Sequence, residues 1–219
     1  MSVKLNEVVK FFDDILKPSE FDDVSNNGIQ VARSKEEVKR IAFAVDASLK
    51  TVKAAAKAGA DLLVVHHGLS WGGGIKRIDG AMYEIVKTAI NADLAIYASH
   101  LPLDANKLCG NNWELAREMK LKKIKPAFSY HGNVIGLTGY TPDGRKVGVC
   151  SGGAGEFAPA AKFLKCEEFI TGEANWAEVI AAENVGIKLT TLGHYESETY
   201  GVKALMRETA ALDVETMFI

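Results

Sequence analysis

Two adjacent histidines, His66 and His67, follow the apolar run 62–65 and precede Gly68. Imidazole is a common ligand of zinc, manganese and iron. Adjacent residues of a regular strand point to opposite faces, so both rings can address one pocket only if the chain turns at Gly68 or if each ring binds its own ion. Ions in two-metal hydrolytic sites lie roughly 3.5 to 4 Å apart, which suits the second arrangement. The pair therefore predicts a metal site, against the alternative of hydrogen-bonded histidines at the rim of a sheet.

Two further histidines are accompanied by carboxylates. Asp104 lies four residues after His100, and Glu198 lies four residues after His194. If the second segment enters a helix, His194 and Glu198 share one face of it, where a carboxylate can bridge two cations. Such a spacing also arises by chance in many helices. Because ligands gather beyond the carboxyl ends of the strands of an α/β sheet, the convergence of these residues with Asp46 at strand ends is the main argument for the site.

Imidazole and carboxylate ligands suit zinc, manganese or iron, and the ligand set does not separate them. A pair of such ions favours hydrolytic chemistry on a polar substrate. The three cysteines lack CxxC spacing, which argues against a thiolate site and favours a reducing compartment. They are Cys109, Cys150 and Cys166.

His131, the remaining histidine, has no carboxylate spaced near it, so we interpret it as structural. The glycines 72–74 lack the Lys-Ser or Lys-Thr that completes a phosphate-binding P-loop. We expect them to form a flexible loop beside the paired histidines, with Lys76 and Arg77 as candidate anion contacts.

Short apolar runs predict the strands that position these residues, and most are apolar on both faces, as buried strands are. Helix-length segments alternate with many of them, which implies an α/β fold. Strands are expected at 40–45, 62–65, 94–98, 134–138, 147–151, 168–171, 188–192 and 214–218, and helices at 49–57, 82–91, 112–119, 159–164, 176–183 and 198–208.

The alternation breaks near residue 120, where NVIGLTGYTPDGRKVGVCSGG predicts two strands joined by a Thr-Pro-Asp-Gly turn. This hairpin is expected to open a second lobe of about 126–189, with the first lobe at about 1–125 and 190–219. No charge block or low-complexity linker separates them, so we expect closely packed lobes that share a cleft.

Charge and hydropathy exclude several classes of protein. The 219 residues are 47% hydrophobic, enough for an ample core, and carry 26 basic and 28 acidic side chains. This balance makes nucleic acid an unlikely partner. The first residues predict an amphipathic helix instead of a signal peptide, and no window approaches the roughly 20 apolar residues of a membrane span. A cytoplasmic protein is expected.

The motifs together resemble the Nif-three-like family, whose members are often called GTP cyclohydrolase I type 2 homologues. The resemblance covers nearly the whole chain in its compact form, without the domain that some relatives insert. The motifs that carry it are Asn-Asn-Gly-Ile-Gln-Val at 26–31, His-His-Gly-Leu at 66–69, His-Leu-Pro-Leu-Asp at 100–104, Thr-Gly-Glu at 171–173 and Gly-His-Tyr-Glu-Ser-Glu at 193–198. The chain departs from the family pattern where Ser25 precedes the first motif, where Ala32 ends it, and where Gly68 replaces a frequent proline.

The resemblance implies two interlinked α/β lobes with mixed sheets and a dinuclear metal site in the cleft between them, with two divalent ions (Zn, Fe or Mn) per chain. It also implies assembly as a toroidal homohexamer. His67 and Asp104 would bind one ion, His66 and His194 the other, and Glu198 would bridge both. His100 would lie beside the site, where it or Glu198 would handle protons as a catalytic group.

Two functions follow from this ligand set. The first is a metal-dependent hydrolase of a nucleotide-like small molecule, as the family name suggests. The alternative is a metal-carrier or regulatory metal-binding protein without its own turnover, because a ligand set does not fix a reaction. A metal site that only stiffens the oligomer is a third interpretation.

Overall fold

The computed structural model describes residues 2–219 and divides them into two compact units. The first unit extends to Leu103 and resumes at Val202–Ile219, and the second is Asp104–Gly201. The sequence placed these boundaries near 125 and 190. They differ because helix α5 (Asn111–Glu118) packs on strands of the second unit, and because the first turns of α8 (His194–Glu208) also belong to that unit.

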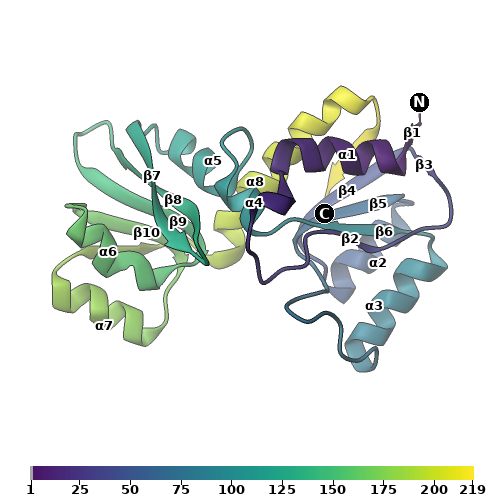
Figure 1. Ribbon diagram of the computed structural model, residues 1–219, viewed down its shortest axis with the longest axis horizontal. Helices are drawn as coiled ribbons and strands as arrows, with labels where there is room; N and C mark the ends of the chain where they lie inside the picture. The colour runs from purple at the N-terminus through teal and green to yellow at the C-terminus, as the bar shows by residue number, and fades with distance from the viewer. Residues whose placement is uncertain (1) are drawn as a thin grey trace. The chain divides into compact units, whose positions relative to one another are not determined.

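The first unit contains a five-stranded sheet, as far as residues 2–219 show (Figure 1). Four neighbouring strands of this sheet are parallel. The fifth strand, β2, lies at one edge and pairs antiparallel with β6. The order is β12 (Glu215–Phe218), β4 (Arg40–Asp46), β5 (Leu62–His67), β6 (Ala95–Ala98) and β2 (Gly28–Val31). The sheet is apolar on both faces, as the sequence predicted for its inner strands.

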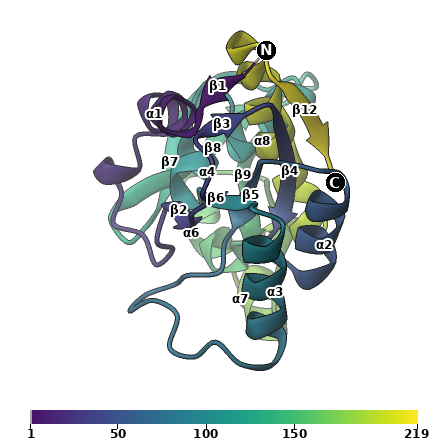
Figure 2. The same ribbon diagram turned by 90° about the vertical axis from the view of Figure 1, so that its right-hand side faces the viewer.

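Helices cover both faces of this sheet. α2 (Leu49–Lys57) and α3 (Gly80–Asn91) lie side by side (Figure 2) and pack their apolar residues against one face. On the other face, the stripe of α1 (Leu5–Leu16) buries Phe12 edge-on against Phe43 of β4. Phe12 is fully buried, so its replacement by alanine would cost about 3 to 5 kcal/mol. A short β1–β3 pair (Val3–Lys4 with Glu37–Val38) completes the unit.

The second unit contains a mixed sheet, five-stranded within the described chain. β11, β10 and β9 are parallel, and β8 and β7 continue the sheet antiparallel. The strands, in spatial order, are β11 (Lys188–Thr191), β10 (Glu168–Glu173), β9 (Lys146–Gly153), β8 (Asn133–Tyr140) and β7 (Lys122–Tyr130). The predicted hairpin is confirmed as β8 and β9, and both units have the predicted α/β class with mixed sheets.

The sequence missed β7, which forms an edge of this sheet. Three lysines and Pro126 hide its strand character, and proline is tolerated in a sheet mainly at such edges. A two-residue turn, His131-Gly132, joins β7 to β8, and both residues have positive φ, as a type I′ turn requires. His131 thus lies in a hairpin turn, and its structural role stays a prediction.

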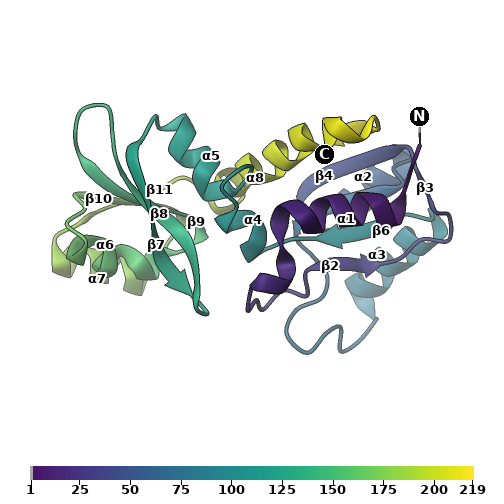
Figure 3. The ribbon, with the colours of Figure 1, turned by 45° about the horizontal axis from the view of Figure 1, so that its top comes forward.

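The helices of the second unit also cover both faces of its sheet. α5 packs on β8 and β9, whereas α6 (Ala158–Phe163) and α7 (Trp176–Val185) lie together on the other side (Figure 3). α4 (Leu101–Ala105), which the sequence did not predict, carries Asp104. Across residues 2–219, no helix is long and apolar enough to cross a bilayer.

Candidate metal centre

His66 ends the buried part of β5 and is itself fully buried. Its Nδ1 lies 3.0 Å from the carbonyl oxygen of Ser99, which follows the neighbouring strand β6. A carbonyl oxygen can only accept, so Nδ1–H is the donor and the lone pair of the ring is on Nε2. The backbone directly after β6 thus fixes the tautomer in which His66 can ligate a cation.

His67, the next residue, is oriented by a carboxylate. Asp46 is its partner in the register of β4 and β5, and its Oδ1 accepts from Nδ1 of His67 at 2.9 Å. The His66 and His67 rings nevertheless approach each other, with centroids 4.6 Å apart. Ligating histidines usually donate their other N–H to a carboxylate or carbonyl, and both members of the pair do so here.

His100 joins the same cluster. Its ring lies 5.1 Å from that of His66, and its Nδ1 bonds Oδ1 of Asp23 at 2.8 Å. One ligand atom each of His66, His67 and His100 can be chosen so that all lie within 4.8 Å of one another. The sequence predicted that His100 lies beside the metal ligands. The structure places its ring close enough to those of His66 and His67 for it to be a third ligand of one ion.

Asp23, which the sequence did not single out, fixes this part of the cluster. Its Oδ2 accepts from the backbone N–H of Leu101 at 2.9 Å and from the amide of Asn27 at 2.9 Å. Burial raises the pKa of Asp23, but hydrogen bonds from His100, Asn27 and Ser25 outweigh it and lower the pKa to about 2. Asp23 therefore remains a carboxylate at neutral pH.

Gly68 does not act as the hinge that the sequence suggested. Its φ is not positive, and a Cβ there would collide with the amide of Gln30 and lie 2.6 Å from Cβ of Ala98. The same Gln30 amide oxygen accepts from the backbone of Leu69 and Ser70. Glycine is thus required by the close approach of Gln30, which holds the chain just after the paired histidines.

In the second unit, α8 begins at His194, so His194 and Glu198 share one helical face, as predicted. Nε2 of His194 lies 3.2 Å from Oε1 of Glu198, and its Nδ1 lies 3.0 Å from Oε1 of Glu173 in the Thr-Gly-Glu motif. The two carboxylates, Glu198 first, raise the pKa of His194 to about 9. A cation bound at this ring would therefore displace a proton.

The end of β9 adjoins both predicted carboxylate ligands. Ser151 donates to Oδ1 of buried Asp104 at 3.1 Å, and Asn111 donates to the same oxygen at 2.9 Å. A Cβ on Gly152, the next residue, would lie 2.5 Å from Oε1 of Glu198. Glycine at this position, with φ of +66°, leaves the space that the Glu198 carboxylate occupies.

The donor set of each unit fits divalent metal binding. All four candidate histidines have Nδ1 against an oxygen acceptor, and Asp104 has one carboxylate oxygen fixed by two donors. The partners Asp23 and Glu173 lie far from their histidines in sequence, so residue spacing gave no signal for them. Within each unit, the structure brings the predicted ligands to the same strand ends.

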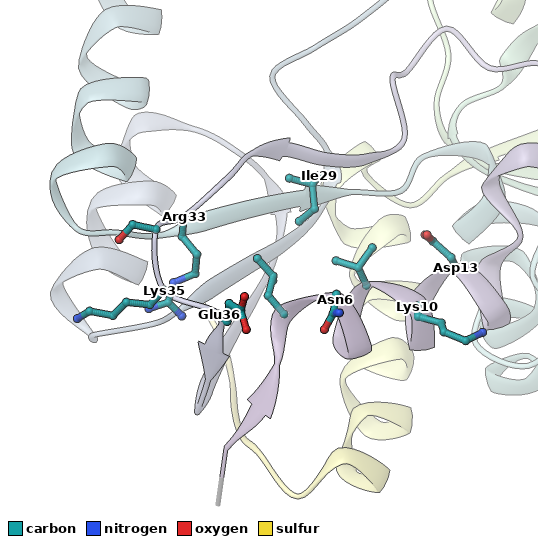
Figure 4. A pocket seen from close by; sticks show the side chains of 10 residues that line it. Asn6, Lys10, Asp13, Ile29, Arg33, Lys35 and Glu36 are labelled. Atoms are coloured by element: carbon teal, nitrogen blue, oxygen red, sulfur yellow. The ribbon is translucent and has the colours of Figure 1, made fainter.

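A groove elsewhere in the first unit is unrelated to these ligands. It has a volume of about 550 Å³ and lies beside α1 and the chain after β2 (Figure 4). Its walls mix apolar side chains such as Ile29 with the charged Lys10, Asp13, Arg33 and Glu36. None of the predicted metal ligands lines it.

The model of the family Duf34/NIF3 (NGG1p interacting factor 3) matches residues 3–144 and 131–219. The chain belongs to the NIF3 family. A curated relative from Archaeoglobus fulgidus, "GTP cyclohydrolase 1 type 2 homolog", is 39% identical over 99% of this chain and 98% of its own length. This relationship confirms the resemblance inferred from the motifs.

Solved structures of NIF3-like proteins share the fold. "Structural genomics, protein ybgI, unknown function" has a TM-score of 0.91 and 27% identity, covering 99% of this chain and 98% of that chain. "Reduced HcgD from Methanocaldococcus jannaschii" has a TM-score of 0.88 and 25% identity, covering 100% and 98%. The chain is thus a NIF3 protein whose His and Glu clusters could hold a metal ion.

Proposed function

We propose that this NIF3 protein binds two divalent metal ions and is a metal-dependent hydrolase of a nucleotide-like small molecule. The observation that carries the proposal is the shared orientation of the histidines, each with Nδ1 against an oxygen acceptor and thus with Nε2 as the ligand atom. Metal-ligating histidines usually have this orientation, because an outer acceptor holds the ring nitrogen that does not bind the ion. A structural cluster has no reason to repeat the same orientation with four different acceptors.

The ligand assignment follows the family pattern. In that pattern His67 and Asp104 would hold one ion, His66 and His194 would hold the other, and Glu198 would serve both. The imidazole and carboxylate donors suit zinc, iron or manganese. A pair of such cations, when bound, activates water for hydrolysis and neutralises negative charge on the substrate.

We assign proton handling to His100, which lies beside the ligands, and to Glu198, which is itself a proposed ligand. His100 is oriented through Nδ1 by ionised Asp23, so its Nε2 is the atom that would take up or release a proton. Glu198, nearly fully buried, is the second candidate for this role. The cytoplasmic location and the hexameric ring are parts of the same proposal, supported by family membership alone.

Turnover tests the catalytic half of the proposal. Protein reconstituted with zinc, iron or manganese is incubated with GTP and a panel of nucleotides, and products are separated by chromatography. We expect a metal-dependent product that Asp104→Ala abolishes and that His131→Asn, a change in the hairpin turn, leaves intact. Absence of product with every metal and every nucleotide would contradict hydrolase function.

A carrier function is the second candidate, because two of the proposed ligands are accessible. The His67 side chain is 22% exposed and the His194 side chain is 36% exposed, which favours exchange with an acceptor. Radioactive zinc bound to the protein should then leave within minutes when a chelator is added. Retention of the ion throughout the challenge, together with nucleotide turnover, would exclude the carrier.

A further inference from the structure

Trp71 is the feature of the first unit that the metal ligands leave unexplained. Its ring lies 5.1 Å from that of His100, edge-on, and 6.0 Å from that of His67. Although two imidazoles contact the indole, 36% of the residue remains exposed. A large aromatic surface is thus left open directly beside the proposed metal ligands.

Hydrogen bonds hold this ring in place. The indole N–H donates to the carbonyl of Gly68 at 2.9 Å, and the backbone N–H of Gly72 donates to Val24 at 2.6 Å. Asn26, from the first family motif, bonds Ser70 through both its backbone and its side chain. A tryptophan side chain that is already fixed in one orientation loses little further conformational entropy when another ring packs on it.

The chain beyond Trp71 leaves room for a ligand. Apart from each glycine and its two chain neighbours, no heavy atom of the described residues lies within 4 Å of the positions that Cβ atoms on Gly72, Gly73 and Gly74 would take. The long loop that contains them leads from β5 to α3 (Figure 2). The glycines thus leave access to the fixed indole ring unobstructed, as binding of another molecule beside it requires.

We propose that Trp71 is a stacking platform for a planar heterocyclic ring of the substrate, such as a purine base, and that it determines specificity for that ring. This inference rests on the proposed function and adds to it the part of the substrate that the chain recognises. Aromatic rings prefer offset-stacked or edge-to-face contacts, and the indole face suits a nucleobase. Trp71 is a specificity residue in this account, because the metal ligands and proton-handling groups are other side chains.

Calorimetric binding of two ligands to the zinc-loaded protein tests the inference without turnover. GMP carries a base, whereas ribose 5-phosphate has the same sugar phosphate without one. Base stacking on an aromatic side chain is strong enough that Trp71→Ala should weaken GMP binding by about ten-fold or more. Trp71→Phe should retain most of the affinity, and Trp176→Ala, a change at an exposed tryptophan of α7, should retain all of it.

The result supports the inference if Trp71→Ala loses GMP affinity while its zinc content and its affinity for ribose 5-phosphate match those of the wild type. Equal GMP affinity in wild type and Trp71→Ala, equal loss for both ligands, or no GMP binding by the wild type would overturn it. Turnover separates this inference from the hydrolase proposal. Trp71-dependent binding without product contradicts only the hydrolase, and product formation at wild-type efficiency by Trp71→Ala contradicts only the stacking platform.

Discussion

Replacing Asp46 with alanine removes the carboxylate that orients His67 and leaves every proposed metal ligand in the sequence. Loss of such an outer partner typically weakens metal affinity about 10- to 100-fold. The Asp46 side chain is 48% exposed, so solvent screening brings its bond to His67 toward the roughly 0.2 to 1 kcal/mol of a surface pair. Because 1 kcal/mol corresponds to about five-fold in affinity, we expect zinc affinity to fall by about five-fold, below the usual range for an outer partner.

Competition with a chromogenic chelator measures this change in zinc affinity. Asp14→Ala is the matched control, because Asp14 is an exposed carboxylate of α1 that pairs with Lys10. The melting temperature of Asp46→Ala in excess chelator should stay close to that of the wild type, since an exposed side chain contributes little to folding. Zinc affinity within two-fold of wild type, or an equal loss in Asp14→Ala, would refute the role given to Asp46.

Three further changes test the second unit and the core. Gly152→Ala should lower the metal content of the protein because its Cβ meets Glu198, the residue proposed to serve both ions. Gly144→Ala, also at positive φ but in open space, should cost about 1 kcal/mol of stability and no metal; equal metal contents would contradict this. Burial raises the pKa of Glu168, but hydrogen bonds from Thr190, Lys188 and Arg145 lower the pKa below its ordinary value. The ionised Glu168 therefore stabilises the folded protein at neutral pH, and this contribution is lost as the pH falls below about 4. In excess chelator, the melting temperature of wild type should therefore approach that of Glu168→Gln between pH 7 and 3, and a constant difference would argue against this ion pair. Leu63→Ala, at a fully buried position of β5, should lower the free energy of unfolding by about 2 to 5 kcal/mol in a denaturant titration. A loss under 1 kcal/mol would mean that the core around Leu63 is poorly packed.

Much of the fold could be predicted because burial leaves a local trace in the sequence. β5 is a continuous apolar run, and α8 carries His194 and Glu198 at a helical spacing, so both elements and their ligands were found. β7 was missed because an edge strand buries little and tolerates lysine and proline. The unit boundaries were misplaced because the packing of α5 on its sheet is a tertiary contact without a sequence signature.

The ligand types could be read from the sequence, but their supporting contacts could not. Asp23 lies 77 residues from His100, and Glu173 reaches His194 only because α8 begins where β10 ends. Trp71 carried no signal either, since a single aromatic residue in a glycine-rich segment has many interpretations. The outer partners of a metal site are set by the fold, which is why the structure adds most at this level.

Metal analysis of protein purified without added metal tests the central claim most directly. Wild type, His67→Ala and His131→Asn are measured together by elemental mass spectrometry, with circular dichroism as the check on folding. The paired-ion account predicts about two ions per chain in wild type and His131→Asn, falling toward one in folded His67→Ala. No metal in any of the three, or the same content in all of them, would contradict it.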